Sequence, residues 1–568
     1  MGIALAGILL FVAFQNFSTL PLAPAPAPLP PTVPAFGLDY WPPGHSSNAL
    51  FSRDSGLLTD GDLGWEAHKF TASADMDFMK SLGVKVIRLV FWPAPSGYSP
   101  RTSTSQALAA LKLAELKRHL PEFVRMAARR DIKVIVGFTN DYLRTCDNEE
   151  NPMVCPGTTE RTTFYWKRFL PEIPGATEDQ KFNYLVTTGL DWIHSIYSIF
   201  EDNDLMDRVV YFDLHAELYN GTPRLWEYIN RVFSQTSFIP SNKLAIGLLR
   251  CHPNSPDIPG DPRNDDVFYF LRSFSSEFFR RFSFVDFHSY PVLQDSRRGH
   301  QANPDIVGCS KRINAKLPGK IQILGEFGAW TPGAKNAEDR QRTNLLAVQE
   351  KIELTNIVAA LHWQLYDGTP TPNYNAHFGL LYAPDSPKEG LAAIISKQCL
   401  YINNDFEEVE FGNAPRSWYA ESTDASRPTL RALQNSDYAA TGSRFARLEI
   451  PASSDSTFAW MRSALVAVRP GERLYVNAFL RSGSIKNVRI NVREFDGEKT
   501  FLSDIRGRAV KLDGWRWHQY IRAANPLPDQ PFFFQLSPET QNVMIIVSAE
   551  PEIGSAAMLD VDSLSISQ

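Results

Sequence analysis

Eight short apolar runs recur along residues 36–400, and longer polar and amphipathic stretches separate them. Apolar runs of this length are typical of buried strands, whereas the stretches between them follow helical spacing. The runs are Phe36–Trp41, Val84–Phe91, Ile132–Phe138, Val209–Leu214, Leu244–Leu249, Phe284–His288, Ile321–Gly325 and Ile357–Leu365. Strands that alternate with helices form a parallel sheet, and eight such units close into a barrel. We therefore predict an α/β fold, a (β/α)8 TIM barrel, over residues 36–400.

The stretches between these runs are long enough to cross back between parallel strands. The predicted helices include Ala72–Leu82, Ser105–Arg129, Phe182–Glu201, Asp265–Arg281, Glu338–Glu353 and Gly390–Lys397. Long insertions follow the third and fifth strands, so we expect a barrel above the typical size of about 250 residues.

The sequence changes character after Cys399. Short alternating runs replace the helical pattern, and turns rich in Gly, Pro, Ser and Asp separate them. The runs include Arg444–Ile450, Arg473–Leu480, Asn487–Arg493 and Val543–Ser548. This pattern is typical of an all-β sandwich, which we predict over residues 401–568. Only a few residues separate it from the last barrel helix, so we expect the two regions to pack against each other.

Residues 2–14 are all apolar or small. Such a run suits the apolar part of a signal peptide and is shorter than the roughly 20 residues that span a bilayer. Seven prolines between Pro21 and Pro34 then favour an extended stalk. We assign residues 1–20 to a signal peptide or membrane anchor and 21–35 to a Pro-rich stalk. The expected location is secreted, periplasmic or envelope-anchored, with an apolar N-terminus on a cytosolic protein as the alternative.

Composition narrows the classes of partner. Lys and Arg number 57 against 63 Asp and Glu, a formal net charge of −6, and no long run of one sign occurs, so we expect no nucleic-acid partner. Cys146 and Cys155 flank a polar loop that an oxidising compartment could close. The other cysteines lack C-x-x-C spacing and no H-E-x-x-H segment occurs, so we expect no metal and no cofactor. We expect a monomer.

Two glutamates follow strands of the predicted barrel. Glu217 comes after the fourth strand and Glu326 after the seventh. Because the carboxyl ends of all eight strands meet at one rim, both side chains are expected there. A pair of carboxyl groups is what glycosidic bond cleavage requires, since one protonates the leaving oxygen while the other attacks the anomeric carbon or activates water. A glutamate at a strand end can also be a simple ion-pair partner, so its neighbours matter.

Four further residues at the strand ends fit the same chemistry. Arg88 lies near the end of the second strand, His288 and Tyr290 end the sixth, and Trp363 lies in the eighth. An Arg and a Tyr beside a carboxylate keep it ionised and oriented. A Trp offers a face on which a sugar ring can stack.

These strand ends carry the segments Leu82-Gly-Val-Lys-Val-Ile-Arg88, Phe287-His-Ser-Tyr290, Leu324-Gly-Glu-Phe-Gly328 and Leu361-His-Trp-Gln364. With them, residues 36–400 resemble the clan A glycoside hydrolases, the retaining (β/α)8 enzymes, nearest the cellulase-like family 5 group. The resemblance implies that Glu217 is the acid/base and Glu326 the nucleophile. It also implies that Tyr290 and Arg88 are partners of the nucleophile and that Trp363 is the platform for the sugar beside the cleavage point.

One position departs from this pattern: these families usually carry Asn before the acid/base Glu, and here Ala216 stands there. An Asn would bind the sugar 2-OH, a contact that strengthens in the transition state. His215 or Asn140 could supply the contact, the substrate could lack a free 2-OH, or the barrel could bind sugar without cutting it. We predict a retaining glycosidase that cleaves β-glycosidic bonds in a polysaccharide or oligosaccharide. The alternative is a noncatalytic polysaccharide-binding barrel that organises an exopolysaccharide.

The C-terminal region more loosely resembles carbohydrate-binding jelly-roll modules, which begin near an Asn-x-Asp-Phe-Glu segment. Its candidate stacking residues are Trp418, Tyr419, Trp460, Trp515 and Trp517. Aromatic side chains in a sandwich also build its core. Sugar binding and a role as a buttress for the barrel are therefore both open for this region.

Overall fold

The computed structural model describes residues 35–40, 64–91, 103–138, 175–215, 223–248, 274–289, 306–329, 335–367, 378–400, 406–409, 414–423, 428–434, 439–441, 444–452, 458–524 and 531–568. Residues Pro34–Gln568 form one compact unit. The predicted signal peptide or anchor, nearly all of the predicted stalk, and the Cys146–Cys155 loop lie outside the described residues.

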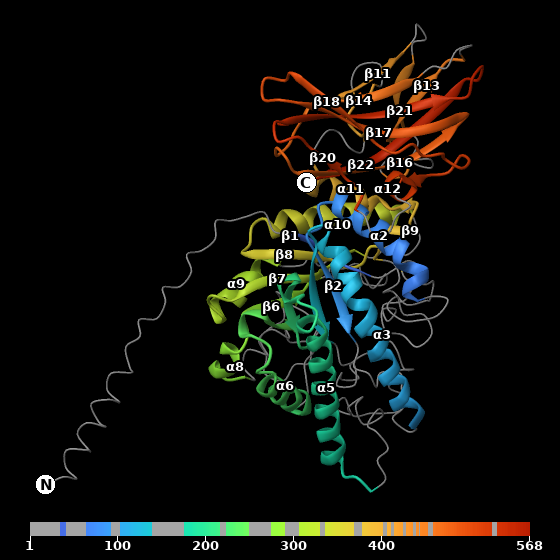
Figure 1. The fold of residues 1–568 in the computed structure, drawn as a ribbon. Coiled ribbons are helices and arrows are strands. Elements are labelled where there is room, and N and C mark those ends of the chain that lie inside the picture. The colour runs from blue at the N-terminus through green and yellow to red at the C-terminus, as the bar shows by residue number, and fades with distance from the viewer. Residues whose placement is uncertain are drawn as a thin grey trace, which may run out of the picture. The chain divides into compact units, whose positions relative to one another are not determined.

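Eight parallel strands close into a barrel in which each strand pairs with its neighbours along the chain and β8 pairs with β1 (Figure 1). They are β1 (Ala35–Asp39), β2 (Val86–Phe91), β3 (Lys133–Phe138), β4 (Val209–Asp213), β5 (Leu244–Leu248), β6 (Phe284–His288), β7 (Ile321–Phe327) and β8 (Ile357–His362). The predicted TIM barrel is confirmed. Its interior is filled by an apolar layer in which the rings of Tyr211 and Phe284 stack with centroids 4.9 Å apart.

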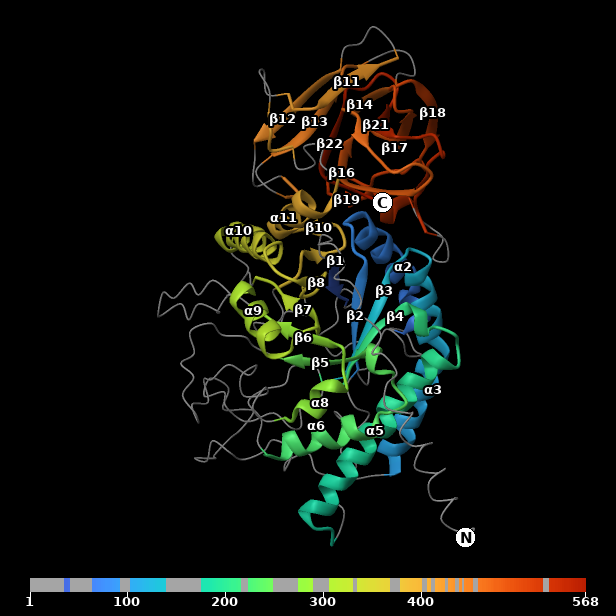
Figure 2. The same cartoon turned by 90° about the vertical axis from the view of Figure 1, so that its left-hand side faces the viewer.

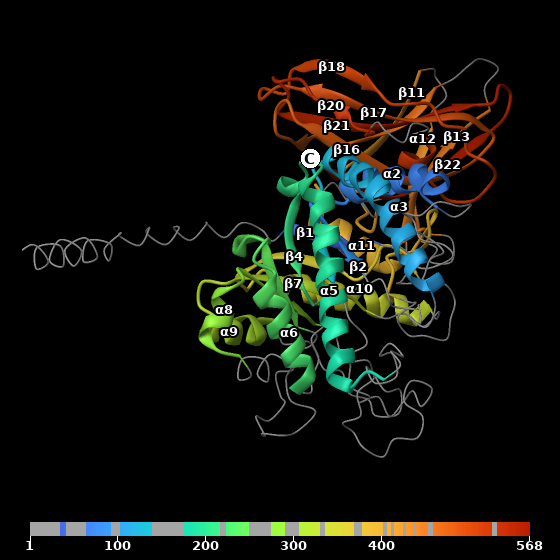
Figure 3. The same cartoon turned by 60° about the horizontal axis from the view of Figure 1, so that its bottom comes forward.

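Helices follow the strands, as the barrel requires (Figure 2). They are α2 (Trp65–Ser81), α3 (Ser103–Ala128), α5 (Glu178–Glu201), α6 (Pro223–Gln235), α8 (Ser276–Arg280), α9 (Ile306–Lys316), α10 (Lys335–Ile352) and α11 (Glu389–Gln398). Figure 3 shows α5 and α6 side by side. A capping box fixes the start of α5, because the Thr177 and Gln180 side chains each bind the other's backbone N–H. The helix predicted from Asp265 begins, within the described residues, only at Ser276, because Ser275 caps it there.

Among the strand ends that differ from the prediction, those of β7 and β8 carry residues of interest. Strand β7 continues past Gly325 to Phe327, so Glu326 lies within the strand. Strand β8 ends at His362 and not at Leu365. Gln364 has a φ of 63°, in the left-handed region, which an extended strand does not adopt.

The C-terminal region forms two six-stranded antiparallel sheets, which confirms the predicted all-β architecture. One has the order β11-β14-β21-β17-β18, with β15 beside β21, and the other β12-β13-β22-β16-β19, with β20 beside β16. The strands and one short helix are β11 (Trp418–Ser422), β12 (Thr429–Gln434), β13 (Arg444–Ile450), β14 (Ala459–Ser463), β15 (Val466–Ala467), β16 (Arg473–Gly483), β17 (Ile485–Phe495), β18 (Phe501–Arg506), β19 (His518–Gln519), α12 (Tyr520–Ala524), β20 (Phe534–Gln535), β21 (Asn542–Pro551) and β22 (Ala557–Ser567). The small hairpin β9 (Leu381–Ala383) and β10 (Ser386–Pro387) precedes α11.

Helix α2 contacts the sandwich directly. The ring of Phe78 packs edge-on against that of Phe479, with centroids 6.1 Å apart. The hydroxyl groups of Ser81 and Ser565 are hydrogen-bonded at 2.7 Å. Apolar residues of the barrel, its helices and the sandwich belong to one continuous buried cluster. The C-terminal half of α2 is therefore buried on all sides, which explains why it holds buried polar residues as well as apolar ones.

Among the described residues, no helix is both long and apolar enough to cross a membrane. Cys309, in α9, is disulfide-bonded, whereas Cys399 is a half-buried free thiol whose pKa is raised to about 12 by desolvation. Spacing along the chain gave no sign that Cys309 is paired, because a disulfide depends on proximity in the fold.

Candidate active site

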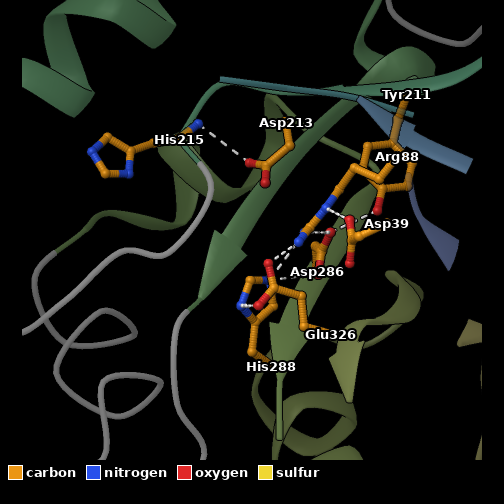
Figure 4. A network of polar contacts seen from close by, with 8 residues as sticks. All are labelled: Asp39, Arg88, Tyr211, Asp213, His215, Asp286, His288 and Glu326. Atoms are coloured by element: carbon orange, nitrogen blue, oxygen red, sulfur yellow. Dashed lines mark hydrogen bonds and ion pairs between the residues drawn. The ribbon is translucent and has the colours of Figure 1, made fainter. Parts of the chain in front are cut away.

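The barrel brings together three of the predicted site residues. Arg88 lies on β2, His288 ends β6 and Glu326 lies near the end of β7, so all three side chains meet at the carboxyl ends of the strands (Figure 4). All three are buried. Glu217, Asn140 and Tyr290 lie outside the described residues.

Arg88 is the centre of this cluster and is fully buried. Its Nε donates a hydrogen bond to Asp39 Oδ1 at 2.6 Å, and its Nη2 donates to Glu326 Oε1. Its Nη1 lies 3.5 Å from Asp286 Oδ2 and 3.0 Å from His288 Nε2. One guanidinium group thus ties four strands of the barrel together through their polar ends. Its planar fork of donors suits this task.

Glu326 has a fixed orientation. Its Oε1 accepts from Arg88, and its Oε2 lies 3.1 Å from His288 Nδ1. Both partners are completely buried, and the Glu326 side chain is only 5% exposed. A carboxylate that accepts a charge-assisted hydrogen bond from a buried guanidinium group keeps one position.

Three aspartates beside Arg88 were not predicted. Asp39 ends β1, Asp213 ends β4 and Asp286 lies within β6, and all three are fully buried. The sequence does contain a signal for them: an acidic residue stands within an apolar run, as in Phe284-Val-Asp-Phe-His288. Such a residue indicates a polar partner nearby, because a buried carboxyl group needs one.

Asp286 is locked between its neighbours. Tyr211 donates its hydroxyl hydrogen to Asp286 Oδ2 at 2.7 Å. On the next strand, a Cβ atom at Gly325 would lie 1.6 Å from Asp286 Oδ1, so only glycine fits there. The glycine before Glu326 therefore makes room for the carboxyl group that supports Arg88.

The charges of the cluster shift the protonation of its members. Burial opposes the positive charge of Arg88, but Asp39 and Asp286 outweigh it and raise the pKa of its guanidinium. Burial and the nearby Asp286 raise the pKa of Asp213 to about 8. Asp213 is therefore mainly protonated at neutral pH, which lowers the negative charge that Arg88 must balance.

Two further predicted site residues, His215 and Trp363, come shortly after the ends of barrel strands. His215 is buried after β4 and donates its backbone N–H to Asp213 Oδ1 at 3.2 Å, while Figure 4 shows its ring turned away from Arg88. Trp363 follows β8 and is half-buried, and its backbone N–H donates to the carbonyl oxygen of Phe327 at 2.7 Å. Trp363 is thereby tied to the residue that follows Glu326.

The described part of the site offers one oriented carboxylate beside a guanidinium and an imidazole. Such a carboxylate can attack an electrophilic carbon or accept a proton. Within the described residues, no group of three or more His, Cys, Asp or Glu side chains is placed to hold a metal ion.

No protein-family model matches this sequence, and no curated protein matches it. The solved structures that match parts of this chain include glycoside hydrolases and a carbohydrate-binding module. An exo-β-1,4-mannosidase from an Opitutaceae bacterium is 14% identical over 67% of this chain and 64% of its own, with a TM-score of 0.40. A family 39 glycoside hydrolase from Bacteroides cellulosilyticus is 11% identical over 91% of this chain and 82% of its own, with a TM-score of 0.37. A carbohydrate-binding module bound to β-1,4-galactotriose is 15% identical over 30% of this chain and 98% of its own, with a TM-score of 0.20.

Proposed function

We propose that the protein is a retaining glycoside hydrolase that cleaves β-glycosidic bonds in a polysaccharide. The observation that carries this proposal is the Glu326 carboxylate at the carboxyl ends of the barrel strands, oriented by Arg88 and His288. A nucleophilic carboxylate must be positioned and shielded from water, and the burial of Glu326 together with its hydrogen bond from Arg88 supports this role.

In the first step, a Glu326 oxygen attacks the anomeric carbon while the bond to the leaving oxygen breaks, and Glu217 gives its proton to that oxygen. In the second step, Glu217 takes a proton from water, whose oxygen attacks the same carbon and releases Glu326. Trp363 holds the sugar by stacking, and Arg88 and Tyr290 keep the nucleophile in place. The first step leaves a glycosyl-enzyme and a deprotonated Glu217, and the second step returns both glutamates to their starting states.

The rival function is sugar binding without cleavage, favoured by Ala216 in place of the Asn usual in clan A enzymes. A binding protein does not need a carboxyl group oriented by an arginine at the barrel rim, so the geometry around Glu326 favours the enzyme. The two functions give different results in one experiment.

The experiment is hydrolysis of a panel of β-linked polysaccharides and aryl β-glycosides by the full chain, by Glu326→Ala and by Glu217→Ala. Both variants should lose activity by about 10³-fold or more. Added azide should rescue both, and the products should differ in configuration. Azide replaces the nucleophile in Glu326→Ala and inverts the anomeric carbon, whereas in Glu217→Ala it attacks the glycosyl-enzyme and gives net retention.

Full activity of Glu326→Ala would contradict the assignment of Glu326 as the nucleophile. Binding of a polysaccharide with no cleavage of any panel member would support the rival function. Glu353→Ala, which changes a half-exposed glutamate of the segment that follows α10, is the control that should keep full activity.

We also propose that the protein is exported and that residues 1–20 direct this. Cys309 supports the proposal, because disulfides persist in oxidising compartments and are rare in the cytosol. Fractionation of cells that express the full chain should place it outside the cytoplasm. Recovery of the full chain in the cytosol with its cysteines reduced would contradict export.

A further inference from the structure

Four charged residues lie in one row across a sheet of the sandwich. In the register of the strands, Arg431 of β12 faces Arg447 of β13, Arg447 faces Asp560 of β22, and Asp560 faces Arg481 of β16. Residues directly opposite one another on neighbouring strands project from the same side of a sheet. The row therefore presents three guanidinium groups and one carboxylate on a single face.

Asp560 is shared by two of these arginines. Arg447 binds it in a bidentate manner, with Nε to Oδ1 at 2.7 Å and Nη2 to Oδ2 at 2.9 Å. Arg481 donates its Nε to Oδ2 at 2.9 Å. One carboxylate thus serves two guanidinium groups, and the exposed Arg431 adds a third directly opposite Arg447. Like charges placed opposite each other destabilise a sheet, so stability alone does not account for this pair.

A tryptophan lies beside the row. The ring of Trp515 is 5.3 Å from the Arg481 guanidinium and 5.6 Å from that of Arg447, and its side chain remains 42% exposed. On β16, Gly483 lets this ring approach the strand, since a Cβ atom there would lie 3.3 Å from Trp515 Cζ3. The ring is therefore held in place before any ligand arrives, which lowers the entropy cost of binding.

The face is partly exposed where the row lies: Arg431 is exposed and the Arg447 side chain is 20% exposed, whereas Arg481 and Asp560 are buried. Further along β16 the same side of the sheet carries Phe479, which packs against α2. At the row, by contrast, Arg431, Trp515 and Met558 are exposed. Glu449 lies in the adjacent row opposite Met558, so the two rows hold three arginines and two carboxylates. The face keeps a positive charge on a chain whose net charge is −6.

We propose that this face of the β12-β13-β22-β16 sheet binds an acidic polysaccharide, with Arg431 and Arg447 engaging carboxylates of uronic-acid units and Trp515 stacking on a sugar ring. Guanidinium groups recognise carboxylates through paired hydrogen bonds, and an exposed indole offers an apolar face to a pyranose. The row crosses four strands that are about 4.8 Å apart, a span that suits several sugar units. This site goes beyond the proposed hydrolase and does not depend on Glu326.

The test is titration calorimetry of the full chain with acidic oligosaccharides of four to six units, namely oligogalacturonate, oligomannuronate and oligoglucuronate. For the acid that binds, the fully methyl-esterified oligomer is the matched ligand, because it keeps the rings and removes the charge. Arg431→Gln and Trp515→Ala should each weaken binding about tenfold or more. Raising the salt concentration from 50 to 500 mM should also weaken it, since exposed charges are screened.

The matched control variants are Arg506→Gln and Phe501→Ala, which change an exposed arginine and an exposed aromatic residue on β18 of the other sheet. They should leave the affinity unchanged. Equal affinity for the methyl ester, equal weakening by the control variants, or no binding of any of the three acids would each overturn the proposal. Glu326→Ala should bind as the unchanged protein does, and Trp515→Ala should still hydrolyse small aryl glycosides, so this site and the proposed hydrolase can fail separately.

Discussion

The Arg522 guanidinium group, in helix α12 of the sandwich, donates a hydrogen bond to the hydroxyl oxygen of Tyr366 at 2.8 Å. Tyr366 follows β8 by four residues and comes three residues after Trp363. Both Arg522 and Tyr366 also bind the buried carboxylate of Asp75 in α2. A charged residue of the sandwich thus holds the segment that follows Trp363, the proposed sugar platform.

Replacing Arg522 by Met should destabilise the whole protein by about 3 kcal/mol, because the variant leaves the Asp75 carboxylate buried without its cation. Urea denaturation measures the change. Arg493→Met is the control, because Arg493 donates a hydrogen bond of 2.7 Å to Asp504 in a partly exposed ion pair. This variant should lose less than about 1 kcal/mol of stability. Equal losses in the two variants would contradict the role assigned to the buried ion pair.

Arg88→Lys should separate catalysis from stability. Lysine keeps the charge but lacks the planar fork that holds Asp39 and Glu326 together, so kcat should fall about 10²-fold. Arg130→Lys is the control, because Arg130 is also fully buried and binds Asp77 Oδ1 through Nε at 2.6 Å. That variant should lower the thermal midpoint without changing kcat. A similar fall of kcat in both variants would assign the loss at Arg88 to general destabilisation.

Gly325→Ala should destabilise the barrel by about 2–3 kcal/mol or more, since the added methyl group meets the Asp286 carboxyl group, which Tyr211 holds in place. Gly137→Ala, on β3, is the comparison, because its added Cβ would meet no atom closer than 3.8 Å. Thermal unfolding of both variants measures the difference. If Gly325→Ala proves as mild as Gly137→Ala, the close approach of Asp286 does not fix this position.

Asp213→Asn should change how stability depends on pH. The folded-state pKa of Asp213 is raised to about 8, above its ordinary value of 3.8, so the folded protein binds a proton that the unfolded chain releases between these values. Its contribution to stability therefore falls as the pH rises from about 4 to 8. Asparagine has no such proton to lose. The free energy of unfolding of the variant, relative to that of the unchanged protein, should therefore be higher at pH 8 than at pH 5. Urea unfolding of both proteins at the two pH values measures this difference.

A result in which the stability difference between the two proteins stays constant from pH 5 to pH 8 would contradict the raised pKa of Asp213. Asp504→Asn is a suitable control, because Asp504 is partly exposed on β18 and far along the chain from the barrel site.

The barrel could be predicted because its strands are nearly continuous apolar runs. Phe284–His288 is predicted and observed with the same bounds. The strand ends were harder to place, because they depend on single residues. Gln364 ends the extended conformation through a positive φ that its sequence neighbours do not reveal. Glu326 continues β7 because its backbone takes part in the pairing with β6 at His288.

The candidate site could be predicted in part, for a physical reason. Arg88, His288 and Glu326 stand at strand ends, where the barrel topology brings them together. Asp39, Asp213 and Asp286 were missed, because an acidic residue within or just after an apolar run has no periodicity to reveal its partner. Only the closed barrel places these carboxyl groups around one guanidinium.

The continuous core of barrel and sandwich limits how this chain can change by recombination. Accessory domains on flexible linkers can be exchanged between proteins, because neither domain buries apolar surface against the other. Here α2 has Phe78 and Ser81 against the sandwich, so a replacement module would have to reproduce the shape and polarity of β16 and β22. A substitution in α2 is therefore expected to require a compensating substitution in β16 or β22, so the barrel and the sandwich should evolve together.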